Sequence, residues 1–466
     1  MDVLHTSIAR VDSYPQSKIA WYACAVLTVG CALAFLDRGI ITLFIVPIQR
    51  DLGLTDTQIS LLVGLAFGVF NAIFGLPLAR WIDKGRRTMI AACGILAWSI
   101  ATAACGVAGN FWQLFAARMA VGVGESTVMP SGVSLLADLF PPSRRAAAMG
   151  TFYSGIYIGS GCAFLVGGLL WRLLGDRLVP LPLIGAFHSW QVILLAVGAA
   201  GLLLAPLTLL IREPKRLEGG VAIAPVGLPI PAVARFYRSN ARTMIGHSVG
   251  FCLQNFPLHA GAVWLATMAV RTLGWSITQA GAIYGIMMLV LGPAGSASAG
   301  LLADWMARRG RTDGKLIICI GAALATALGS AVLVTHPSSG AVVGAIGFLC
   351  YFGPFVLPLA PGALQDIVPN AMRGQATAIY VGAINVVSGS IAPTSVALLT
   401  DYVFHDKAMV GVSLGIVGVT ASCAAALVLY FTLKPFRRSA EALGGTQSQL
   451  IDSQSLPEPH AAVYRS

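Results

Sequence analysis

Residues 19–45 read IAWYACAVLTVGCALAFLDRGIITLFI and form a long, almost entirely apolar run. It is longer than the roughly 20 apolar residues that an α-helix needs to cross a bilayer, so it predicts a membrane-spanning helix. Two opposite charges, Asp37 and Arg38, interrupt it. A charge at membrane depth is costly, and such residues usually line a water-filled or substrate pathway. We therefore expect this pair to be functional.

The composition places the rest of the chain in a membrane as well. The 466 residues are 56% hydrophobic and only 11% charged, which is far below the charged share of a soluble domain. The net charge of +11 does not indicate nucleic acid binding, because the basic residues are scattered between apolar runs and form no single patch. The nine cysteines lie in apolar runs without CxxC spacing, so we expect them to pack as small apolar side chains. We expect no metal and no cofactor.

Twelve apolar runs are each long enough to span a bilayer. Their approximate bounds are 19–45, 59–78, 89–107, 111–136, 148–173, 190–211, 244–270, 279–302, 316–334, 341–364, 376–399 and 410–433. They predict an all-α membrane protein with two pseudo-symmetric six-helix bundles, over residues 19–211 and 241–434. We interpret residues 1–18 as an N-terminal segment, 212–240 as a mobile linker, and the polar residues 435–466 as a disordered tail.

The distribution of Lys and Arg predicts the orientation. Outside the apolar runs these residues fall mostly on one side of the membrane. The other side carries only Arg50, Arg172, Arg177, Arg271 and Lys407. Because basic residues accumulate in cytoplasmic loops, both termini and the linker are predicted to be cytoplasmic.

Two short patterns recur in the second half and indicate an internal repeat. Residues 138–145, DLFPPSRR, match residues 366–373, DIVPNAMR, with Asp, Pro and Arg at the same spacings. Residues 79–83, ARWID, match residues 300–304, GLLAD, and basic residues follow each. The alternative is coincidental loop chemistry, and two matches at similar offsets argue against it.

Four strongly charged residues lie at membrane depth: Asp37, Arg38, Arg118 and Glu125. We name them the quartet; together they are formally neutral. At about 1.5 Å per residue, Asp37 lies about 27 Å from the inner end of the first helix and Arg118 about 10 Å from the outer end of the fourth. These two residues could therefore meet at one depth. Arg118 and Glu125 are seven residues apart and share a helix face.

The loop from Asp83 to Arg87, its counterpart at Asp304, and Arg118, Gly122 and Gly124 in the fourth run resemble motifs of the major facilitator superfamily. The resemblance covers nearly the whole chain. It implies that Asp83 tethers helix ends in the outward-facing state; the alternative is a solvated loop carboxylate. The gate residues that it implies are Asp83, Arg86, Arg87, Asp304 and Arg308.

Within this superfamily the chain is similar to bacterial members of the Spinster family, whose animal relatives export sphingosine-1-phosphate or lysophospholipids. The matching residues are Leu36-Asp37-Arg38, 51–54 with Gln58, Phe115, Arg118, Gly122, Gly124, Glu125, Pro130, and Phe140-Pro141 with Arg145. The quartet pattern also occurs in the anion:cation symporters, which carry sugar acids and other small organic anions with protons. The resemblance implies a multi-pass protein of the bacterial inner membrane. As partners we expect a small amphipathic or anionic substrate, protons and membrane lipids; we expect no nucleic acid, and a monomer.

The quartet suggests a mechanism. Burial and a nearby arginine have opposite effects on the pKa of a carboxyl group, so a carboxylate balanced between them can titrate near neutral pH when the arginine leaves. We interpret Asp37 and Glu125 as proton-coupling sites, and Arg38 and Arg118 as a charge switch that pairs with them or binds an anionic substrate. The alternative is four structural charges that lock the first helix to the fourth.

The second half has no Asp, Glu, Lys or Arg at mid-membrane. A cavity with charge on one wall and apolar or aromatic surface on the other would suit an amphipathic substrate, although aromatic side chains in membrane helices also serve packing. His259 could be a proton site or a hydrogen-bonded structural residue. The secondary cavity candidates are Asn71, Tyr153, Tyr157, Gln254, Asn255, His259, Tyr284, Phe352 and Asn385.

The motifs GxxxxGK and HExxH do not occur, so ATP-driven pumping and metalloprotease chemistry lack support and we expect no enzyme. The main interpretation is proton-coupled secondary transport of a lysophospholipid or sphingolipid-like amphiphile by alternating access between the two bundles. Proton-coupled transport of a small organic anion or drug is the second interpretation. A non-transporting membrane receptor or sensor that kept the fold is the third.

Overall fold

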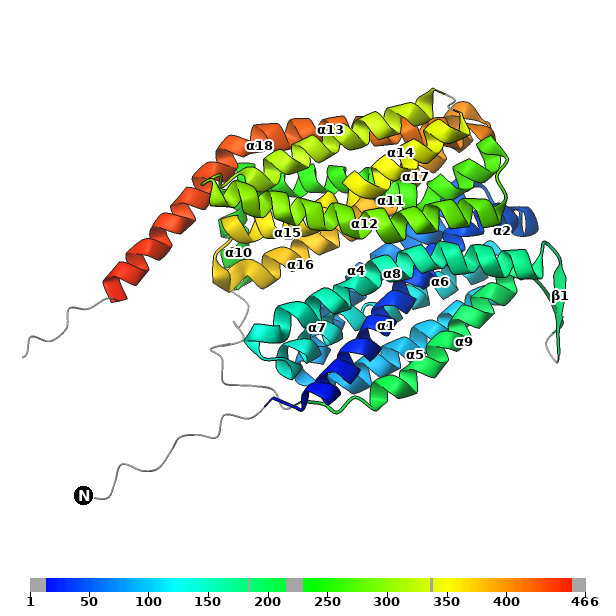
Figure 1. The fold of residues 1–466 in the computed structure, drawn as a ribbon, viewed down its shortest axis with the longest axis horizontal. Helices are drawn as coiled ribbons and strands as arrows, with labels where there is room; N and C mark the ends of the chain where they lie inside the picture. Colours follow the sequence, from blue (N-terminus) through cyan, green and yellow to red (C-terminus); the bar gives the residue numbers. More distant parts are fainter. Residues whose placement is uncertain (1–13, 183–184, 215–228, 336–337, 455–466) are drawn as a thin grey trace, which may run out of the picture.

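The computed structural model describes residues 14–182, 185–214, 229–335 and 338–454. Most of its helices run along one long axis (Figure 1). The first half contains α1 (Ser17–Leu43), α2 (Ile45–Leu52), α3 (Asp56–Ser60), α4 (Ala66–Lys84), α5 (Arg87–Gly106), α6 (Phe111–Glu125), α7 (Val128–Leu139), α8 (Pro142–Leu174) and α9 (Ser189–Leu209). The second half contains α10 (Ile230–Ser239), α11 (Ala241–Leu273), α12 (Ile277–Arg308), α13 (Gly314–Val334), α14 (Ser339–Phe352), α15 (Val356–Ile367), α16 (Arg373–Ala383), α17 (Ala392–Leu398) and α18 (Val410–Gln454).

Shorter elements join these helices. The π-helical segments are η1 (Leu61–Leu65), η4 (Ile384–Ile391) and η5 (Leu399–Phe404). The 3-10 segments are η2 (Gly353–Phe355), η3 (Asn370–Met372) and η6 (Lys407–Met409). An antiparallel hairpin of β1 (Leu178–Leu181) and β2 (Gly185–His188), with Leu178 opposite His188, lies outside the bundles and was not predicted.

The predicted twelve-helix fold is confirmed. Ten helices of the described chain are long and apolar enough to cross a membrane. The two further predicted spans lie in α6 with α7 and in α11. The fourth span is interrupted directly after Glu125, where the hydroxyls of Ser126 and Thr127 donate to the carbonyls of Val123 (2.7 Å) and Gly124 (2.9 Å). Such local bonds compete with the helical ladder, which accounts for the break.

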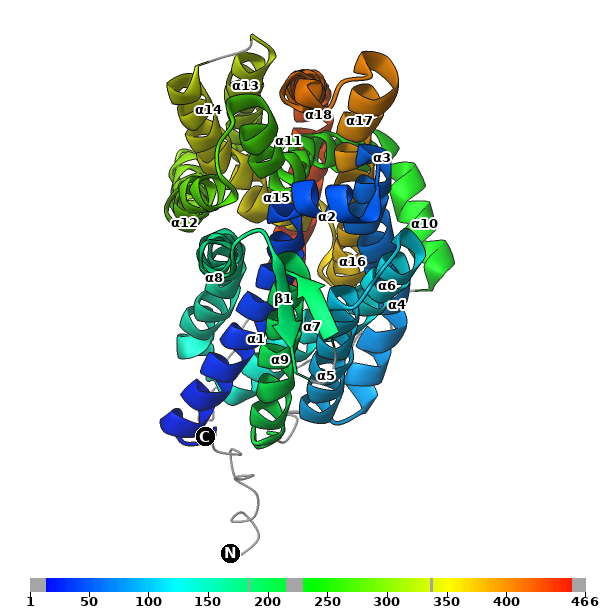
Figure 2. The ribbon, with the colours of Figure 1, turned by 90° about the vertical axis from the view of Figure 1, so that its right-hand side faces the viewer.

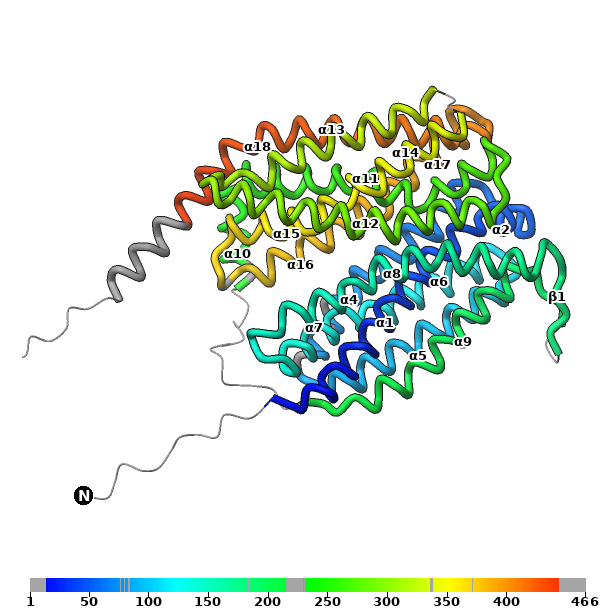
Figure 3. Tube along the Cα trace, in the orientation of Figure 1, coloured from blue at the N-terminus to red at the C-terminus, as the bar shows by residue number. Residues whose placement is uncertain are grey.

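The helices form two bundles, one from each half, that lie side by side (Figures 1 and 2). The described chain starts and ends at one end of the molecule, which we name the termini end, and the β1–β2 hairpin lies at the opposite, hairpin end (Figures 1 and 3). The halves approach closely where α8 meets α12. A Cβ added at Gly285 would lie 2.8 Å from the carbonyl oxygen of Gly161, so this contact requires a residue without a side chain.

The internal repeat is visible as one charge pair built twice. In the first half, Nη1 of Arg87 donates to the carboxylate of Asp138 and to the carbonyl of Ser134. In the second half, Nζ of Lys315 donates to Asp366 (2.6 Å) and to the carbonyl of Gly362 (3.1 Å). In each half the two residues of the charge pair are 51 positions apart in the sequence, and the two residues of the carbonyl contact are 47 positions apart. Asp138 and Asp366 open the two matched sequence patterns, so the repeat extends into the third dimension.

Two segments differ from the sequence prediction. The predicted linker 212–240 contains α10 within its described part, and its residues 215–228 lie outside the described chain. The predicted disordered tail is wrong at its start, because α18 continues beyond residue 434. Phe436 is fully buried, and Nε of Arg437 donates to Asp313 at 2.6 Å. These contacts hold the extra turns against α13. The predicted segment 1–18 falls outside the described residues up to residue 13.

Candidate functional site

Two members of the quartet form a pair that is buried in the first half. Nη1 of Arg118 (α6) donates to Oδ2 of Asp37 (α1) at 3.1 Å, and the hydroxyl of Thr102 (α5) donates to Oδ1 at 2.9 Å. The side chain of Arg118 is 2% exposed and that of Asp37 is 1% exposed. The predicted meeting of Asp37 and Arg118 is therefore confirmed. Nε of Arg118 is buried and has no hydrogen-bond partner in the described structure.

The other two members form a second pair that is open on one side. Nε of Arg38 donates to Oε2 of Glu125 at 2.5 Å. Glu125 is fully buried, whereas 31% of the Arg38 side chain is exposed. The second carboxylate oxygen of Glu125, Oε1, is buried without a partner among the described residues. An unsatisfied carboxylate oxygen in a low-dielectric site is costly unless it gains a proton or a donor.

Phe67 of α4 links the two pairs. Its ring centroid lies 4.4 Å from the guanidinium carbon of Arg38 and 5.4 Å from that of Arg118. Gly122 of α6 makes this packing possible, because an added Cβ there would lie 2.6 Å from the carbonyl oxygen of Phe67. Phe35 covers Arg38 from α1, with its ring centroid 4.6 Å from the guanidinium carbon. The exposed cation therefore lies against two aromatic rings.

Several of the polar candidates lie at the contact between the halves. Nδ2 of Asn71 donates to the carbonyl of Gly122 at 3.1 Å, and Nδ2 of Asn385 donates to Oδ1 of Asn71 at 3.5 Å. Nδ1 of His259 donates to the carbonyl of Asn255, four residues earlier in α11, at 3.0 Å.

The remaining candidates divide into orphaned and packed side chains. Gln254 is fully buried and neither amide atom has a described partner. The ring of Tyr284 packs edge-on against Phe164, with centroids 4.5 Å apart, which is a packing role between the halves. Phe352 belongs to an aromatic cluster with Tyr351 and Phe355. Tyr157 faces Gly292 of α12, whereas Tyr153 is 42% exposed.

Sequence reasoning missed a clamp between the halves at the hairpin end. Arg271 of α11 donates to both carboxylate oxygens of Asp56 in α3, at 2.7 and 2.8 Å, and also to Gln49. Asp56 is fully buried. Beside it, Asp401 of the second half accepts from the backbone N–H and the hydroxyl of Thr57, each at 2.7 Å. We name these residues the hairpin-end clamp; Figure 2 shows α3 beside α17 at this end.

The expected gate residues lie at the termini end, in different surroundings. Arg87 is buried, whereas Arg86, Asp304 and Arg308 are exposed. The side chain of Asp83 lies outside the described residues. The proposed tether by Asp83 therefore stays a prediction.

Arg87 also anchors the start of the linker through Glu213. One carboxylate oxygen of Glu213 accepts from the backbone N–H and Nε of Arg87, and the other accepts from the N–H and hydroxyl of Thr88, over 2.6–3.1 Å. Burial would raise the pKa of Glu213, but the hydrogen bonds from Thr88 and Arg87 more than offset this and lower it below 4.5.

We expect Glu213→Gln to destabilise the fold by about 1.5–3 kcal/mol at pH 7, the usual contribution of hydrogen bonds to a charged group. The pKa of Glu213 is lower in the folded chain than in the unfolded chain. The stabilisation by its carboxylate is therefore complete above the unfolded-state pKa and is lost as the pH falls through the folded-state pKa. Thermal unfolding in detergent at pH 7 and near pH 3 measures this difference. Glu441→Gln, which changes an exposed carboxylate on α18, is the control. Equal midpoints for the two variants at pH 7 would contradict the anchor.

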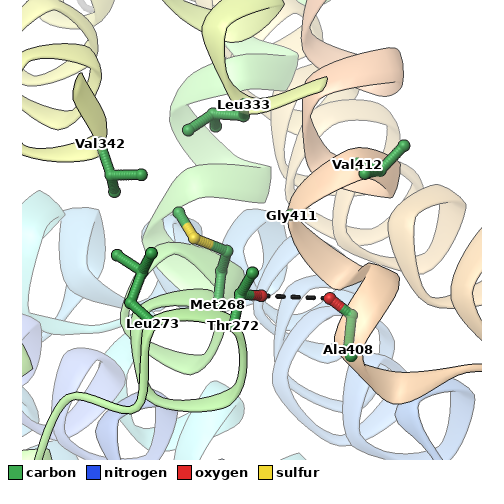
Figure 4. Close-up of a pocket in the computed structure, with 8 residues that line it drawn as sticks. All are labelled: Met268, Thr272, Leu273, Leu333, Val342, Ala408, Gly411 and Val412. Atoms are coloured by element: carbon green, nitrogen blue, oxygen red, sulfur yellow. Dashed lines mark hydrogen bonds between the residues drawn. The ribbon is translucent and has the colours of Figure 1, made fainter. Parts of the chain in front are cut away.

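Other features of the described chain offer no chemistry. No group of three or more His, Cys, Asp or Glu among the described residues could hold a metal ion. A pocket of about 10 Å³ between Met268, Leu333 and Val412 has room for about one water molecule (Figure 4). The hydrolase-like pattern GVSLG at 411–415 lies inside α18, where Ser413 is fully buried and accepts a hydrogen bond from Thr400. A nucleophile elbow requires a strand-to-helix turn instead.

Comparisons with known proteins agree with this architecture. The family model described as Major Facilitator Superfamily matches residues 27–393. An MFS-type efflux pump of Mycolicibacterium smegmatis is 27% identical over 83% of this chain and 86% of its own length. A probable L-galactonate transporter of Escherichia coli is 23% identical over 90% of each chain. A probable sphingolipid transporter, spinster homolog 2 of Arabidopsis thaliana, is 26% identical over 56% of this chain and 53% of its own.

A solved structure gives the same fold. The crystal structure of a bacterial homolog to the human lysosomal transporter Spinster, inward-facing and unoccupied, superposes with a TM-score of 0.73 at 21% identity. It covers 92% of this chain and 98% of the other. The resemblance to Spinster-like members is thereby supported, and the relatives named above are transporters rather than enzymes. The chain belongs to the Major Facilitator Superfamily and is a multi-pass membrane transporter.

Proposed function

We propose that the protein is a proton-coupled secondary transporter that moves an anionic or zwitterionic lysophospholipid or sphingolipid-like amphiphile by alternating access. The observation that carries this proposal is the asymmetry of the quartet. One ion pair is closed on all sides, whereas the other has a partly exposed arginine and a carboxylate oxygen without a donor. A switch needs one stable pair and one that can be exchanged.

The polar contacts between the halves support an inward-facing state. If the basic termini end is cytoplasmic, the hairpin-end clamp closes the outer side. Asn71 and Asn385 join the halves at the depth of Gly122, which is on the fourth span between Arg118 and Glu125. In this state the quartet would be accessible to protons and substrate from the cytoplasm.

The proposed cycle follows from the charges. A proton on Glu125 removes the negative partner of Arg38, and the quartet becomes net positive. Arg38 then binds the anionic head group of the substrate, which keeps the low-dielectric site neutral. Deprotonation restores the Arg38–Glu125 pair and expels the anion. The Asp37–Arg118 pair would hold α1 against α6, and the carboxylate of Asp37 would serve as a second proton site.

The surroundings of Arg38 support an amphipathic substrate. Phe35 and Phe67 flank its guanidinium group, and Phe352 lies in an aromatic cluster of the second half. A head group bound by Arg38 would therefore have apolar neighbours for an acyl chain. The similarity to the sphingolipid transporter of Arabidopsis thaliana supports the same substrate class.

A small organic anion is the second candidate substrate. It is favoured by the similarity to the probable L-galactonate transporter, which extends over 90% of each chain. Arg38 would then bind a carboxylate rather than a phosphate.

Flux into proteoliposomes separates the two candidates. A fluorescent lysophospholipid and a panel of sugar acids, each tested under the same imposed pH gradient, provide the comparison. Lysophospholipid flux that is not inhibited by the sugar acids supports the first candidate. Sugar-acid flux without lysophospholipid movement would replace it with the second.

The hairpin-end clamp makes a separate prediction. We expect Arg271→Gln to shift the population toward outward-facing conformations by at least about tenfold, because two charged hydrogen bonds to the buried Asp56 are lost. Distances between spin labels at Leu178 and Tyr402, both exposed at the hairpin end, measure this shift in a cysteine-free background.

The matched control for the clamp is Arg50→Gln. Arg50 lies at the same end, but its partners Asp51 and Asp176 belong to its own half. We expect the control to keep the wild-type distance distribution. If Arg271→Gln also keeps it, the clamp does not hold the outer side closed.

A further inference from the structure

A second cavity lies away from the quartet, at the termini end of the second half. Its volume is about 390 Å³, within the range of small-ligand sites. It is open on one side and is lined by the end of α12, the beginning of α13, the end of α15, the beginning of α16 and the extension of α18. Small residues, Ala307, Gly310 and Ala440, leave the space open.

The lining of this cavity is basic. Arg311, Lys315 and Arg373 contribute three positive charges, and Asp366 contributes one negative charge. Lys315 is already paired with Asp366 at 2.6 Å. Asp313, just outside the lining, is shared between Arg437 at 2.5 Å and Arg311 at 3.3 Å. With Asp313 and Arg437 included, these groups still carry a net charge of two positive units.

Arg373 provides the least satisfied of these cations. One guanidinium nitrogen, Nη2, donates to the carbonyl of Gln365 at 3.0 Å. Its Nε is buried and has no hydrogen-bond partner in the described part of the chain. Arginine carries five N–H donors and lines this cavity here, so its guanidinium group can donate further hydrogen bonds to an anion in the cavity.

The internal repeat shows what such a site holds in the first half. Lys315 and Asp366 correspond to Arg87 and Asp138 in the repeated charge pair. In the first half a further carboxylate, that of Glu213, accepts hydrogen bonds from Arg87 and Thr88 and adds a negative charge to the cluster. In the second half the corresponding cluster borders an open, positively charged cavity.

We propose that this cavity binds a phosphate group, with Arg373 and Arg311 as its cationic ligands. Guanidinium groups suit phosphate because their N–H groups can donate in parallel to two oxygens. Basic pockets at the cytoplasmic ends of membrane helices commonly bind anionic head groups. The phosphate could belong to an anionic phospholipid or to a soluble phosphate. This site does not involve the quartet and does not depend on the proposed transport function.

The test uses the purified full-length protein in lipid nanodiscs. The lipid arm compares phosphatidylcholine with a phosphatidylcholine–phosphatidylglycerol mixture, and the soluble arm titrates inorganic phosphate into phosphatidylcholine nanodiscs at constant ionic strength. The rise in thermal unfolding midpoint reports binding. We expect Arg373→Gln to weaken the binding about tenfold or more, and Arg311→Gln to weaken it as well. The Arg311 side chain is 52% exposed, so its variant should fold even if the other does not.

The matched control is Arg145→Gln. Arg145 is the equivalent of Arg373 in the repeat and also has a buried Nε without a described partner, but it does not line the cavity. A response to phosphatidylglycerol alone assigns a lipid head group, and a response to inorganic phosphate assigns a soluble phosphate; either supports the site if it depends on Arg373 or Arg311. If Arg373→Gln and Arg311→Gln both bind phosphate like the wild type, or if Arg145→Gln weakens the binding equally, the proposal is overturned.

Discussion

Glu125→Gln should abolish proton-driven accumulation of substrate while leaving substrate exchange across the membrane. The glutamine resembles the protonated acid in shape and charge, so Arg38 loses its anionic partner permanently and the quartet stays net positive. Anion binding is then retained, but no proton can be taken up or released at this position. We expect gradient-driven flux to fall about 100-fold or more, the usual effect of removing an essential proton-transfer group.

Parallel measurements of gradient-driven flux and of counterflow in proteoliposomes test this prediction. Asp176→Asn is the control, because Asp176 is an acid of the same half whose described partner, Arg50, lies at the hairpin end. We expect this variant to transport like the wild type. If Glu125→Gln keeps the wild-type flux and pH dependence, Glu125 is not the proton site.

The second large effect concerns the buried pair of Asp37 and Arg118. Replacing Arg118 alone by Gln leaves the carboxylate of Asp37 buried without its cation. Breaking a buried ion pair in this way typically costs about 3–5 kcal/mol. We expect Arg118→Gln to lower the thermal unfolding midpoint strongly and to abolish transport.

The double variant Asp37→Asn with Arg118→Gln separates function from structure. It has no uncompensated charge, and buried ion pairs replaced as a unit are often neutral in stability. We expect its unfolding midpoint to return toward the wild-type value while transport stays absent. If transport also returns, the pair is a structural lock between α1 and α6 and takes no part in coupling.

Much of the architecture follows from the sequence because membrane spans are set by a strong, local signal. A run such as 19–45 must be helical in lipid, since its backbone groups have no water to bond. The meeting of Asp37 with Arg118 could be predicted from helix direction and rise alone. The repeated patterns at 138–145 and 366–373 also predicted equivalent positions in the two halves.

The missed features depend on contacts between distant segments. Asp56 and Arg271 are 215 residues apart, and each reads as an ordinary charge at a helix end. No local pattern indicates that one neutralises the other. The helical start of the tail depends likewise on Phe436 and Arg437 packing on the second half. The sequence also could not predict which quartet arginine keeps an exposed side, because this depends on how Phe67 packs.

Proton movement caused by substrate is a direct test of proton coupling at Glu125. The protein is reconstituted with a pH-sensitive dye inside the vesicles and no imposed gradient, and lysophospholipid is then added outside. We expect a substrate-dependent pH change inside wild-type vesicles that is absent in Glu125→Gln vesicles, although these still exchange substrate. Substrate transport by the wild type without any proton movement would contradict the quartet as the site of coupling.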